Sequence, residues 1–398
     1  MKIVQINATC GAGSTGKICV GISKVLVAQN IENYILYSSR SDGYKLGIRC
    51  SDDNYIKVQA FKSRLFGNYG FNSKKTTRKM IDALEHLSPD IVHLHNIHGH
   101  DCDIEMLFIY FKEHRIKLVW TFHDCWCFTG YCTYFSMVGC NKWQSQCADC
   151  VQRRQYSWFF DRSKELFEKK KKLFENLDLT IVTPSWWLAD IVRQSFFKEY
   201  PIKIIHNGID LDVFKPVKSS FQQKYNIENR KIILGVSFEW EERKGLDIFV
   251  KLAKRLPSDY KIVLVGTDTK IDKRLPEEIL SIHRTQNQEE LAEIYSAADV
   301  FVNPTREDNY PTVNMEAVSC GTPVITFRTG GSPETLDESC GVVVNYNDID
   351  TLEKEIVRIC VDKPYSVEQC VNKAQEFDIN KKFKEYTELY EGIVFAGT

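Results

Sequence analysis

The sequence predicts an α/β protein made of two doubly wound domains, and three observations lead to this prediction. The chain has 398 residues, which is more than one ordinary core holds and suggests two domains. Short runs rich in valine and isoleucine alternate with longer helical patterns, as expected for parallel sheets covered on both faces. This alternation occurs twice, on either side of the polar stretch Asp212–Gln223, which contains Pro216. We therefore expect the domain boundary between residues 215 and 216.

The first expected domain, residues 1–215, contains six candidate strands. Each is a short, continuous apolar run, as is typical of a strand between two helical layers. The runs are Ile3–Ile6, Tyr34–Tyr37, Ile91–Leu94, Leu118–Phe122, Leu179–Val182 and Ile202–Ile205. Helical patterns lie between them at Lys17–Gln29 and Thr76–Leu87.

The second expected domain, residues 216–379, repeats this arrangement. Its candidate strands are Ile232–Val236, Ile262–Val265, Val300–Val302 and Val324–Phe327. Its helical patterns are Asp247–Leu256, Gln288–Ala297 and Tyr310–Cys320. In open sheets of this kind, ligands bind at the carboxyl ends of the strands, so residues that directly follow a strand are the candidates for function.

The composition excludes several classes of protein. Hydrophobic residues make up 43% and charged residues 26% of the chain, which argues against a disordered, collagen-like or coiled-coil protein. No apolar run approaches the roughly 18 residues that a membrane span needs. The first residues soon become too polar for a signal peptide, so we expect a cytoplasmic protein.

The formal net charge of −1 conceals an uneven distribution between the halves. Residues 1–215 carry more basic than acidic side chains, and residues 216–398 carry more acidic ones. Residues 54–81 contain seven basic side chains and no acidic one, and residues 152–172 are basic and aromatic. Such stretches suit anionic lipid headgroups, although ordinary solvated helix faces would have a similar composition.

Six of the 14 cysteines lie between positions 125 and 150, in a Cys-rich insertion. Without a secretory signal, a disulfide framework is not expected. Cys132, Cys140, Cys147 and Cys150 read C-x7-C-x6-C-x2-C, and the final pair has the spacing of a zinc knuckle. Four thiolates would make a structural zinc site. The alternative is a set of buried thiols in an irregular segment.

A glycine-rich turn follows the first strand, from Gly11 to Lys17. It matches the start of a P-loop, but Ile18 stands where a P-loop needs Ser or Thr for Mg²⁺. Gly13 and Gly16 would still let backbone amides approach an anion or a sugar. A simple tight turn between strand and helix is an equally good interpretation.

Histidines mark the ends of two neighbouring strands. His93 and His95 share one face of a strand, Asn96 and His98 follow in the loop, and His123-Asp124 ends the next strand. Imidazoles at strand ends can bind sugar hydroxyls or transfer protons. For His93, an ordinary hydrogen-bonded core position is the better interpretation.

The second half carries a cationic pair and an acidic segment. Arg243-Lys244 precedes an amphipathic helix, a position that suits a diphosphate. The stretch from Asn303 to Ala317 combines a strand end, an acidic loop and a helix that contains Glu316. Helix amides could hold phosphate while a carboxylate accepts the hydroxyls of a ribose. This stretch predicts a nucleotide-sugar pocket.

With these residues in place, the sequence resembles the retaining glycosyltransferases of family 4 over nearly its whole length. That family has the GT-B architecture, in which two Rossmann-like domains face a central cleft. The resemblance rests on the glycine-rich loop, Thr121–Asp124, His206–Asp210, Arg243–Gly245, the segment up to Glu316, and Gly321–Ile325. Asp308 stands eight positions before Glu316 where the family usually has Glu, and Glu239 replaces the family's arginine before Lys244.

The resemblance implies a role for each matching residue. Glu316 would bind the ribose, Glu307 or Asp308 the donor sugar, and Lys244 the diphosphate. The catalytic positions would be His123, Lys244, Asp308 and Glu316. The donor would be bound by Gly13, Gly16, Arg243, Lys244, Glu307, Asn309, Tyr310, Pro311, Thr312 and Glu316. Acceptor-side candidates are Asn96, His98 and Asp124.

The resemblance also implies the reaction and its partners. The first domain would bind a glycan or lipid-linked acceptor, and the second would bind a UDP- or GDP-sugar, with transfer by retention and without a catalytic metal. Residues 380–398 would form a helix that packs back on the first domain. The product would be a surface polysaccharide such as capsule, lipopolysaccharide or exopolysaccharide. The enzyme would be cytoplasmic, with peripheral attachment to the inner face of an anionic plasma membrane, and would bind no nucleic acid.

Two other functions compete with this one. A non-catalytic, two-lobed sugar- or nucleotide-binding protein would have the same fold class, but it would be expected to carry an export signal. A zinc-dependent nucleic-acid-binding protein would explain the cysteines and the basic half. The acidic second half and the lack of a nucleic-acid-binding module disfavour it.

Overall fold

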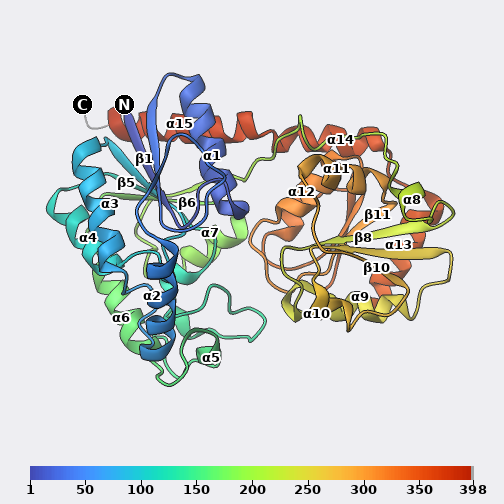
Figure 1. Cartoon of the computed structure of the whole chain (residues 1–398), viewed down its shortest axis with the longest axis horizontal. Coiled ribbons are helices and arrows are strands. Elements are labelled where there is room, and N and C mark those ends of the chain that lie inside the picture. The colour runs from blue at the N-terminus through green and yellow to red at the C-terminus, as the bar shows by residue number, and fades with distance from the viewer. Residues whose placement is uncertain (396–398) are drawn as a thin grey trace. The chain divides into compact units, whose positions relative to one another are not determined.

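The computed structural model describes residues 1–395, which form two compact units with one parallel sheet each (Figure 1). Unit 1 comprises Met1–His206 and Lys382–Thr398, of which the last three residues lie outside the described part. Unit 2 comprises Asn207–Lys381. Both units are doubly wound and Rossmann-like, which confirms the predicted fold class.

The sheet of unit 1 has seven strands in the order β3-β2-β1-β4-β5-β6-β7. The strands are β1 (Lys2–Asn7), β2 (Glu32–Tyr37), β3 (Gly47–Arg49), β4 (Ile91–Leu94), β5 (Leu118–Thr121), β6 (Leu179–Thr183) and β7 (Ile202–Ile204). The helices are α1 (Gly13–Ala28), α2 (Asp53–Phe66), α3 (Lys74–Leu87), α4 (Ile104–Glu113), α5 (Arg153–Tyr156), α6 (Ser163–Leu173), α7 (Trp186–Val192) and α15 (Ile379–Phe395). In the register, Leu94 of β4 lies between Ile6 of β1 and Trp120 of β5. This register brings the carboxyl ends of the three central strands to one edge.

The sheet of unit 2 has six strands in the order β10-β9-β8-β11-β12-β13. They are β8 (Lys231–Val236), β9 (Tyr260–Val265), β10 (Ile279–Ile282), β11 (Val300–Asn303), β12 (Val324–Phe327) and β13 (Gly341–Val344). The helices are α8 (Phe221–Lys224), α9 (Leu246–Ala253), α10 (Thr269–Asp272), α11 (Gln288–Ala297), α12 (Thr312–Ser319), α13 (Ile349–Asp362) and α14 (Val367–Ala374). The order changes direction between β8 and β11, so the ends of these two strands lie at the switch point where such sheets bind ligands.

All ten predicted strands are present, and the three that the prediction missed are β3, β10 and β13. Each of the three lies at the edge of its sheet and is only partly buried. An edge strand covered on one side does not need the continuous apolar run that identifies a central parallel strand. β3 and β10 therefore lack the continuous apolar run on which the prediction depended, whereas β13 has such a run in Val342–Val344 that the prediction overlooked.

The boundary between the units falls at residues 206 and 207, nine residues before the predicted position. Ile209 and Phe214 are buried in the core of unit 2, and Ile209 forms a parallel bridge with Asp378. The polar stretch with Pro216 led us to expect the boundary after residue 215. Packing instead assigns residues 207–215 to unit 2.

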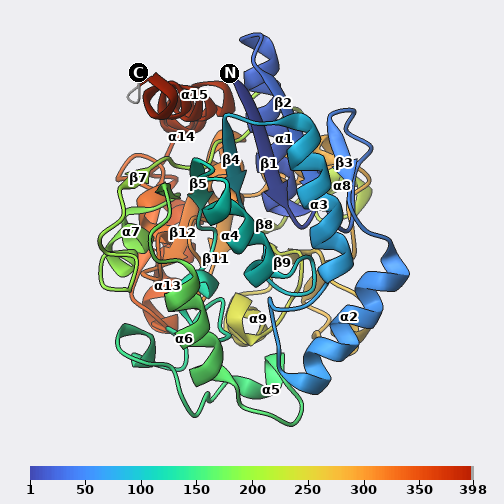
Figure 2. The same cartoon turned by 90° about the vertical axis from the view of Figure 1, so that its left-hand side faces the viewer.

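The C-terminal helix α15 begins in unit 2 and packs on unit 1 (Figure 2). The Tyr390 hydroxyl lies 2.6 Å from His93 Nδ1, and the Tyr386 hydroxyl lies 3.1 Å from Thr121 Oγ1. Lys117 Nζ donates to the carbonyl of Ile393 at 3.0 Å. His93 is fully buried in these contacts, which confirms the expected core position. Among residues 1–395, no helix is long and apolar enough to cross a membrane.

Candidate active site

The histidines that follow β4 and β5 in unit 1 form one hydrogen-bonded chain. Gln5 Nε2 donates to the Cys19 carbonyl at 3.0 Å, which directs Gln5 Oε1 toward His95 Nε2 at 3.1 Å. Because a carbonyl oxygen only accepts, His95 carries its proton on Nε2 and accepts at Nδ1. His95 Nδ1 lies 3.0 Å from His123 Nε2, which must therefore be the donor. Neutral His123 then has Nδ1 as its acceptor atom, which suits a sugar hydroxyl.

Burial keeps both of these imidazoles neutral. Desolvation lowers the pKa of His123 to about 4 and that of His95 well below its usual value. At neutral pH, His123 can therefore accept a hydrogen bond but does not carry a positive charge. The structure thus favours a hydrogen-bonding role for His123 over an electrostatic one.

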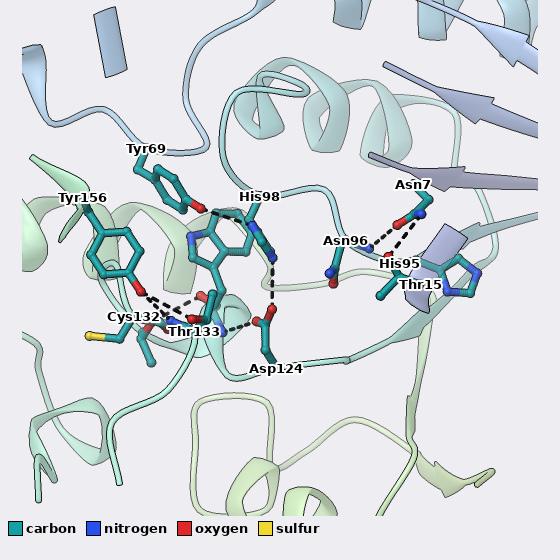
Figure 3. Close-up of polar contacts among 12 residues, drawn as sticks. Asn7, Thr15, Tyr69, His95, Asn96, His98, Asp124, Cys132, Thr133 and Tyr156 are labelled. Carbon is teal, nitrogen blue, oxygen red and sulfur yellow. Dashed lines mark hydrogen bonds and ion pairs between the residues drawn. The ribbon is translucent and has the colours of Figure 1, made fainter. Parts of the chain in front are cut away.

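His98 and Asp124, in the segments that follow β4 and β5, form an ion pair (Figure 3). His98 Nε2 lies 3.0 Å from Asp124 Oδ2, and Asp124 Oδ1 accepts from the Trp126 amide at 2.8 Å. Tyr69 contacts the other ring nitrogen of His98, with its hydroxyl 3.3 Å from Nδ1. Asn96 lies two residues before His98 and is half-buried, and its backbone amide donates to Asn7 Oδ1 at 3.1 Å.

The His98–Asp124 pair should make stability depend on pH. Burial lowers the pKa of His98, but the charge and hydrogen bond of Asp124 outweigh burial and raise it above 6.5. Burial raises the pKa of Asp124, but His98 and the Trp126 amide outweigh burial and lower it below 3.8. The stabilisation from His98 is complete below 6.5 and is lost as pH rises through the raised pKa of His98. The stabilisation from Asp124 exists above 3.8 and is lost as pH falls through its lowered pKa.

We therefore expect Asp124→Asn to destabilise the protein more at about pH 5.5 than at about pH 9, by about 1 kcal/mol. Urea unfolding at the two pH values measures the difference. The His98 imidazole should also titrate at a lower pH in this variant when followed by NMR. Equal destabilisation at both pH values would show that Asp124 stabilises the fold without ion pairing.

The glycine-rich loop has two different kinds of glycine. Gly13 has φ +70°, and a Cβ there would meet no atom within 4 Å, so only backbone conformation requires glycine. At Gly16, in the first turn of α1, a Cβ would lie 2.6 Å from Thr9 Oγ1 and 3.1 Å from the Gly11 amide. Gly16 therefore lets the helix start pack against the preceding loop.

Tyr156 of α5, just after the Cys-rich insertion, links Thr133 of the insertion to Tyr69 beside His98 (Figure 3). The Tyr156 hydroxyl accepts from the Thr133 amide at 3.2 Å, and the Tyr156 ring lies edge-on to Tyr69 with 5.2 Å between ring centroids. The insertion has little regular structure beyond two short 3₁₀ segments, Trp126–Phe128 and Lys142–Gln144. Its conformation therefore influences the position of Tyr69 and, through it, His98.

The four-cysteine zinc site stays a prediction. Cys132 Sγ and Cys150 Sγ lie 3.8 Å apart, and the Gly130 amide donates to Cys147 Sγ at 3.3 Å. Within residues 1–395, however, no group of three or more His, Cys, Asp or Glu side chains is arranged to hold a metal ion. Protein purified without added metal should contain about one zinc per chain if the site exists. Less than about a tenth of an equivalent, with fully reactive thiols, would reject it.

In unit 2, the cationic pair and the acidic loop come together beyond the ends of β8 and β11. Lys244 Nζ donates to Asp308 Oδ2 at 2.6 Å, and Arg243 Nη1 donates to the Glu307 carbonyl at 3.2 Å. Gly245 makes this approach possible, because it has φ +77° and a Cβ there would lie 2.6 Å from the Pro304 carbonyl oxygen. The structure thus brings together four of the residues that the sequence pointed to.

Arg306, which the sequence did not single out, anchors the acidic loop. Its guanidinium binds Asp247 of α9 through two hydrogen bonds, of 2.7 and 2.9 Å, and also binds Asn347 Oδ1 at 3.0 Å. Only 6% of the Arg306 side chain is exposed. Its hydrogen bonds and its charge lower the pKa of the Asp247 carboxyl. The sequence contained no signal for this role, because only the structure shows that the Arg306 guanidinium is buried and therefore needs a carboxylate partner.

Breaking this anchor should cost stability. We expect Asp247→Ala to lower the free energy of unfolding by about 2 kcal/mol, because it leaves a buried arginine without its charged partner. Arg255→Ala is a matched control, since Arg255 pairs with Asp350 and Glu353 on the surface and should cost less than about 1 kcal/mol. Urea unfolding measures both. Equal costs would show that the Arg306 pair is no more than a surface contact.

Glu316 lies a little over one turn into α12, half-buried, and its Oε2 accepts from the Tyr295 hydroxyl at 3.0 Å. Tyr295 of α11 is fully buried, so it holds the Glu316 carboxylate in one orientation.

Gly330, after β12, has φ +55°, and a Cβ there would lie 1.7 Å from the Asp308 carbonyl oxygen. Gly330 thus lets the acidic loop approach the turn after β12 closely. The other predicted donor residues lie between Asp308 and Glu316: Asn309, Tyr310 and Pro311 are buried, and Thr312 is half-buried.

Two family models match the chain and together cover most of it. The one described as Glycosyltransferase Family 4 matches residues 16–213, within and just beyond unit 1. The one described as Glycosyl transferases group 1 matches residues 230–362, within unit 2. Each match contains the candidate residues that the structure gathers in that unit, apart from Gly13.

Individual proteins of known sequence or structure resemble the whole chain. WcaC of Escherichia coli strain K12, named as a colanic acid biosynthesis glycosyl transferase, is 23% identical over 375 residues, which are 88% of each chain. Sucrose-phosphate synthase of Thermosynechococcus elongatus is 19% identical, with a TM-score of 0.72 over 100% of both chains. Anabaena HepE, solved in complex with UDP-glucose, is 13% identical, with a TM-score of 0.70 over 98% of this chain and 100% of that one. At these identities, the two solved structures establish the fold.

Proposed function

Because the chain belongs to the family 4 glycosyltransferases, with a group 1 glycosyl transferase domain in its second unit, we propose that it uses a nucleotide diphosphate sugar. Unit 2 would bind this donor, and unit 1 would bind a glycan or lipid-linked acceptor. The observation that carries the proposal is the cluster beyond β8 and β11, where Lys244 meets Asp308 and Arg243 meets the backbone of Glu307.

The proposed chemistry follows from these groups. The bond between the anomeric carbon and the diphosphate oxygen breaks, and the nucleoside diphosphate leaves with both electrons. The acceptor hydroxyl oxygen bonds to the same face of that carbon, and its proton goes to the leaving phosphate. Lys244 would exchange Asp308 for the diphosphate and stabilise the negative charge that develops there, with no catalytic metal required. Attack on the same face would retain the configuration at the anomeric carbon.

The ribose and the sugar of the donor would contact other residues of the predicted site. Glu316, oriented by Tyr295, would accept both ribose hydroxyls, and Glu307 or Asp308 would contact the sugar. His123 of unit 1, neutral and with Nδ1 as its acceptor, would accept a hydrogen bond from a donor-sugar hydroxyl. HepE, which shares the fold, has been solved with UDP-glucose, which supports a nucleotide sugar as donor.

A thermal-shift screen against UDP- and GDP-sugars tests the donor. A donor at about 100 times its Kd stabilises the native state by about 2.7 kcal/mol, a shift of a few degrees in Tm. Mass spectrometry with candidate acceptors then tests transfer, and repeating the transfer with EDTA tests independence from a metal. If no nucleotide sugar stabilises the protein and none is consumed, the proposal is wrong.

Our proposal for the acceptor rests on the name of a relative and on three residues of unit 1. WcaC is named for colanic acid biosynthesis, so we propose a surface-polysaccharide product and a glycan or lipid-linked acceptor. Asn96, His98 and Asp124 would bind that acceptor. Family membership argues against the non-catalytic sugar-binding alternative.

We propose a cytoplasmic location on the basis of the cysteines. All 14 cysteines lie within residues 1–395, and all are free thiols. Proteins of oxidising compartments usually pair their cysteines, whereas cytoplasmic proteins keep them reduced. Thiol titration of freshly purified, unfolded protein should find 14 reactive thiols, unless zinc holds four of them.

A further inference from the structure

Helix α6 of unit 1 buries one lysine out of a run of four. Lys169, Lys171 and Lys172 are exposed, whereas the side chain of Lys170 has no exposed surface. Removing an amino group from water is unfavourable unless its N–H groups find partners, so lysine is rarely fully buried. A hydrophobic residue would fill the same space without this penalty, and the contacts of Lys170 therefore need a specific explanation.

The partners of Lys170 lie at the 3₁₀ turn Trp126–Phe128, where the Cys-rich insertion begins. Lys170 Nζ donates to the carbonyls of Trp126 at 2.8 Å and of Thr129 at 3.1 Å. It also lies 3.5 Å from the centroid of the Trp126 ring, which is within the range of a cation–π contact. Lys170 thus contacts both the backbone and the ring of Trp126.

These hydrogen bonds do not depend on the charge of Lys170. Burial lowers the pKa of Lys170 to about 7, although Cys127, Cys147 and Asp124 act in the opposite direction. The neutral amine still has two N–H groups, which are enough for the two carbonyls. Both protonation states of Lys170 can therefore hold the turn in place.

Trp126 connects Lys170 to the His98–Asp124 pair. Its amide donates to Asp124 Oδ1 at 2.8 Å, and its ring centroid lies 5.5 Å from that of His98. A Cβ at Gly70 would lie 2.5 Å from Trp126 Cζ2, so the indole is closely packed on that side as well. Asp124 Oδ2 in turn lies 3.0 Å from His98 Nε2. A continuous series of contacts therefore leads from Lys170 to the His98 imidazole.

We propose that Lys170 is a positioning residue for the acceptor side of the active site. By holding the carbonyl of Trp126, it fixes the amide that orients Asp124 and, through Asp124, the His98 imidazole. Lys170 itself touches neither donor nor acceptor. The inference rests on the proposed function, in which Asp124 and His98 bind the acceptor.

The titration of His98 distinguishes positioning from a simple effect of charge. The titratable groups that contact His98 or interact with its charge are Asp124, Asp101, Lys170, Tyr69, His100 and His123. Besides burial, which lowers the pKa of His98, Asp124 raises this pKa and the charge of Lys170 lowers it. If Lys170 acted only through its charge, Lys170→Met would raise the pKa of His98. If Lys170 orients Asp124, the same substitution weakens the ion pair and lowers the pKa of His98.

NMR titration of the His98 imidazole in the full-length protein tests the proposal. Lys170→Met should move this titration to lower pH, while Lys171→Met, at the next and exposed position of α6, should leave it unchanged. Thermal unfolding of Lys170→Met should stay close to that of wild type, because an apolar side chain in place of a buried charge is usually tolerated. In the presence of Asp124→Asn, Lys170→Met should cause no further shift to lower pH, since it acts through Asp124.

Transfer kinetics measure the functional consequence. The donor is the UDP- or GDP-sugar that stabilises the protein in the thermal-shift screen, and octyl β-glucoside serves as a soluble acceptor. Misplacing a binding group by about 1 Å can cost about 10²-fold in rate, so Lys170→Met should lower kcat/KM for this acceptor by about 10- to 100-fold. Hydrolysis of the same donor, in which water replaces the acceptor, should be unchanged, and Lys171→Met should retain both rates.

Several outcomes would overturn the proposal. One is a His98 titration that stays unchanged or moves to higher pH in Lys170→Met, whatever the unfolding temperature of that variant. Others are a further shift to lower pH when Lys170→Met is added to Asp124→Asn, and equal losses of transfer and hydrolysis. The NMR comparison uses no substrate, so its failure leaves the proposed reaction untouched. Wild-type protein that consumes no nucleotide sugar would instead refute the reaction, and NMR would still decide whether Lys170 positions the pair.

Discussion

Replacing Lys244 by methionine should lower kcat/KM for sugar transfer by about 10²–10³-fold, the usual cost of losing one group that stabilises transition-state charge. The ammonium group contacts Asp308 at 2.6 Å and, in the proposed complex, would contact the leaving diphosphate instead. Methionine keeps the length of the side chain and removes its charge. The effect should fall mainly on kcat, because the charge develops as the bond breaks.

Lys254→Met is the control, since Lys254 follows α9 and is exposed. Transfer rates at saturating and limiting donor separate the two kinetic constants, and thermal unfolding shows that both variants are folded. A Lys244→Met enzyme with wild-type kcat would remove Lys244 from the mechanism.

Glu316→Ala should abolish measurable transfer while the protein stays folded. Two charge-assisted hydrogen bonds to a ribose contribute about 1.5–3 kcal/mol each, so their loss corresponds to about 10²–10⁴-fold in kcat/KM. The Tyr295 hydroxyl, which now donates to Glu316 at 3.0 Å, would also lose its partner in the buried region. Donor affinity, measured by calorimetry, should fall together with activity.

Tyr295→Phe separates binding from orientation. It keeps Glu316 and removes only the hydrogen bond that fixes the carboxylate, so it should weaken donor binding by about tenfold or less. Full activity of Glu316→Ala would contradict the assignment of Glu316. A Tyr295→Phe enzyme as inactive as Glu316→Ala would show that Tyr295 itself has a larger role.

The sequence predicted the central strands because burial on both faces leaves a continuous apolar run. β1, β4, β5, β8 and β12 have this pattern, and their positions were predicted to within about a residue or two, the usual uncertainty of element ends. The edge strands β3 and β10 need only part of that burial, so their sequences do not differ clearly from loops, whereas β13 contains three consecutive valines and was overlooked.

For the candidate site, local motifs were predictable and long-range partners were not. The Arg243-Lys244 pair and the acidic loop were visible as motifs, yet only the fold brings Lys244 to Asp308, 64 positions away. Arg306 resembled one more solvated cation until burial and Asp247 gave it a structural role. The Gln5–His95–His123 chain joins β1 to the residues that follow β4 and β5, so no local pattern could have revealed the protonation of His123.

The path of the chain has a consequence for synthesis on the ribosome. Unit 2 is one uninterrupted stretch, Asn207–Lys381, whose ends are adjacent through the bridge between Ile209 and Asp378. Unit 1 is interrupted, because His93 and Thr121 find Tyr390 and Tyr386 only in α15. Domains usually fold in the order in which they emerge, but here the first unit must wait for the last helix. The nascent chain would therefore complete its second unit first, and buried His93 would gain its contact with Tyr390 only at the end.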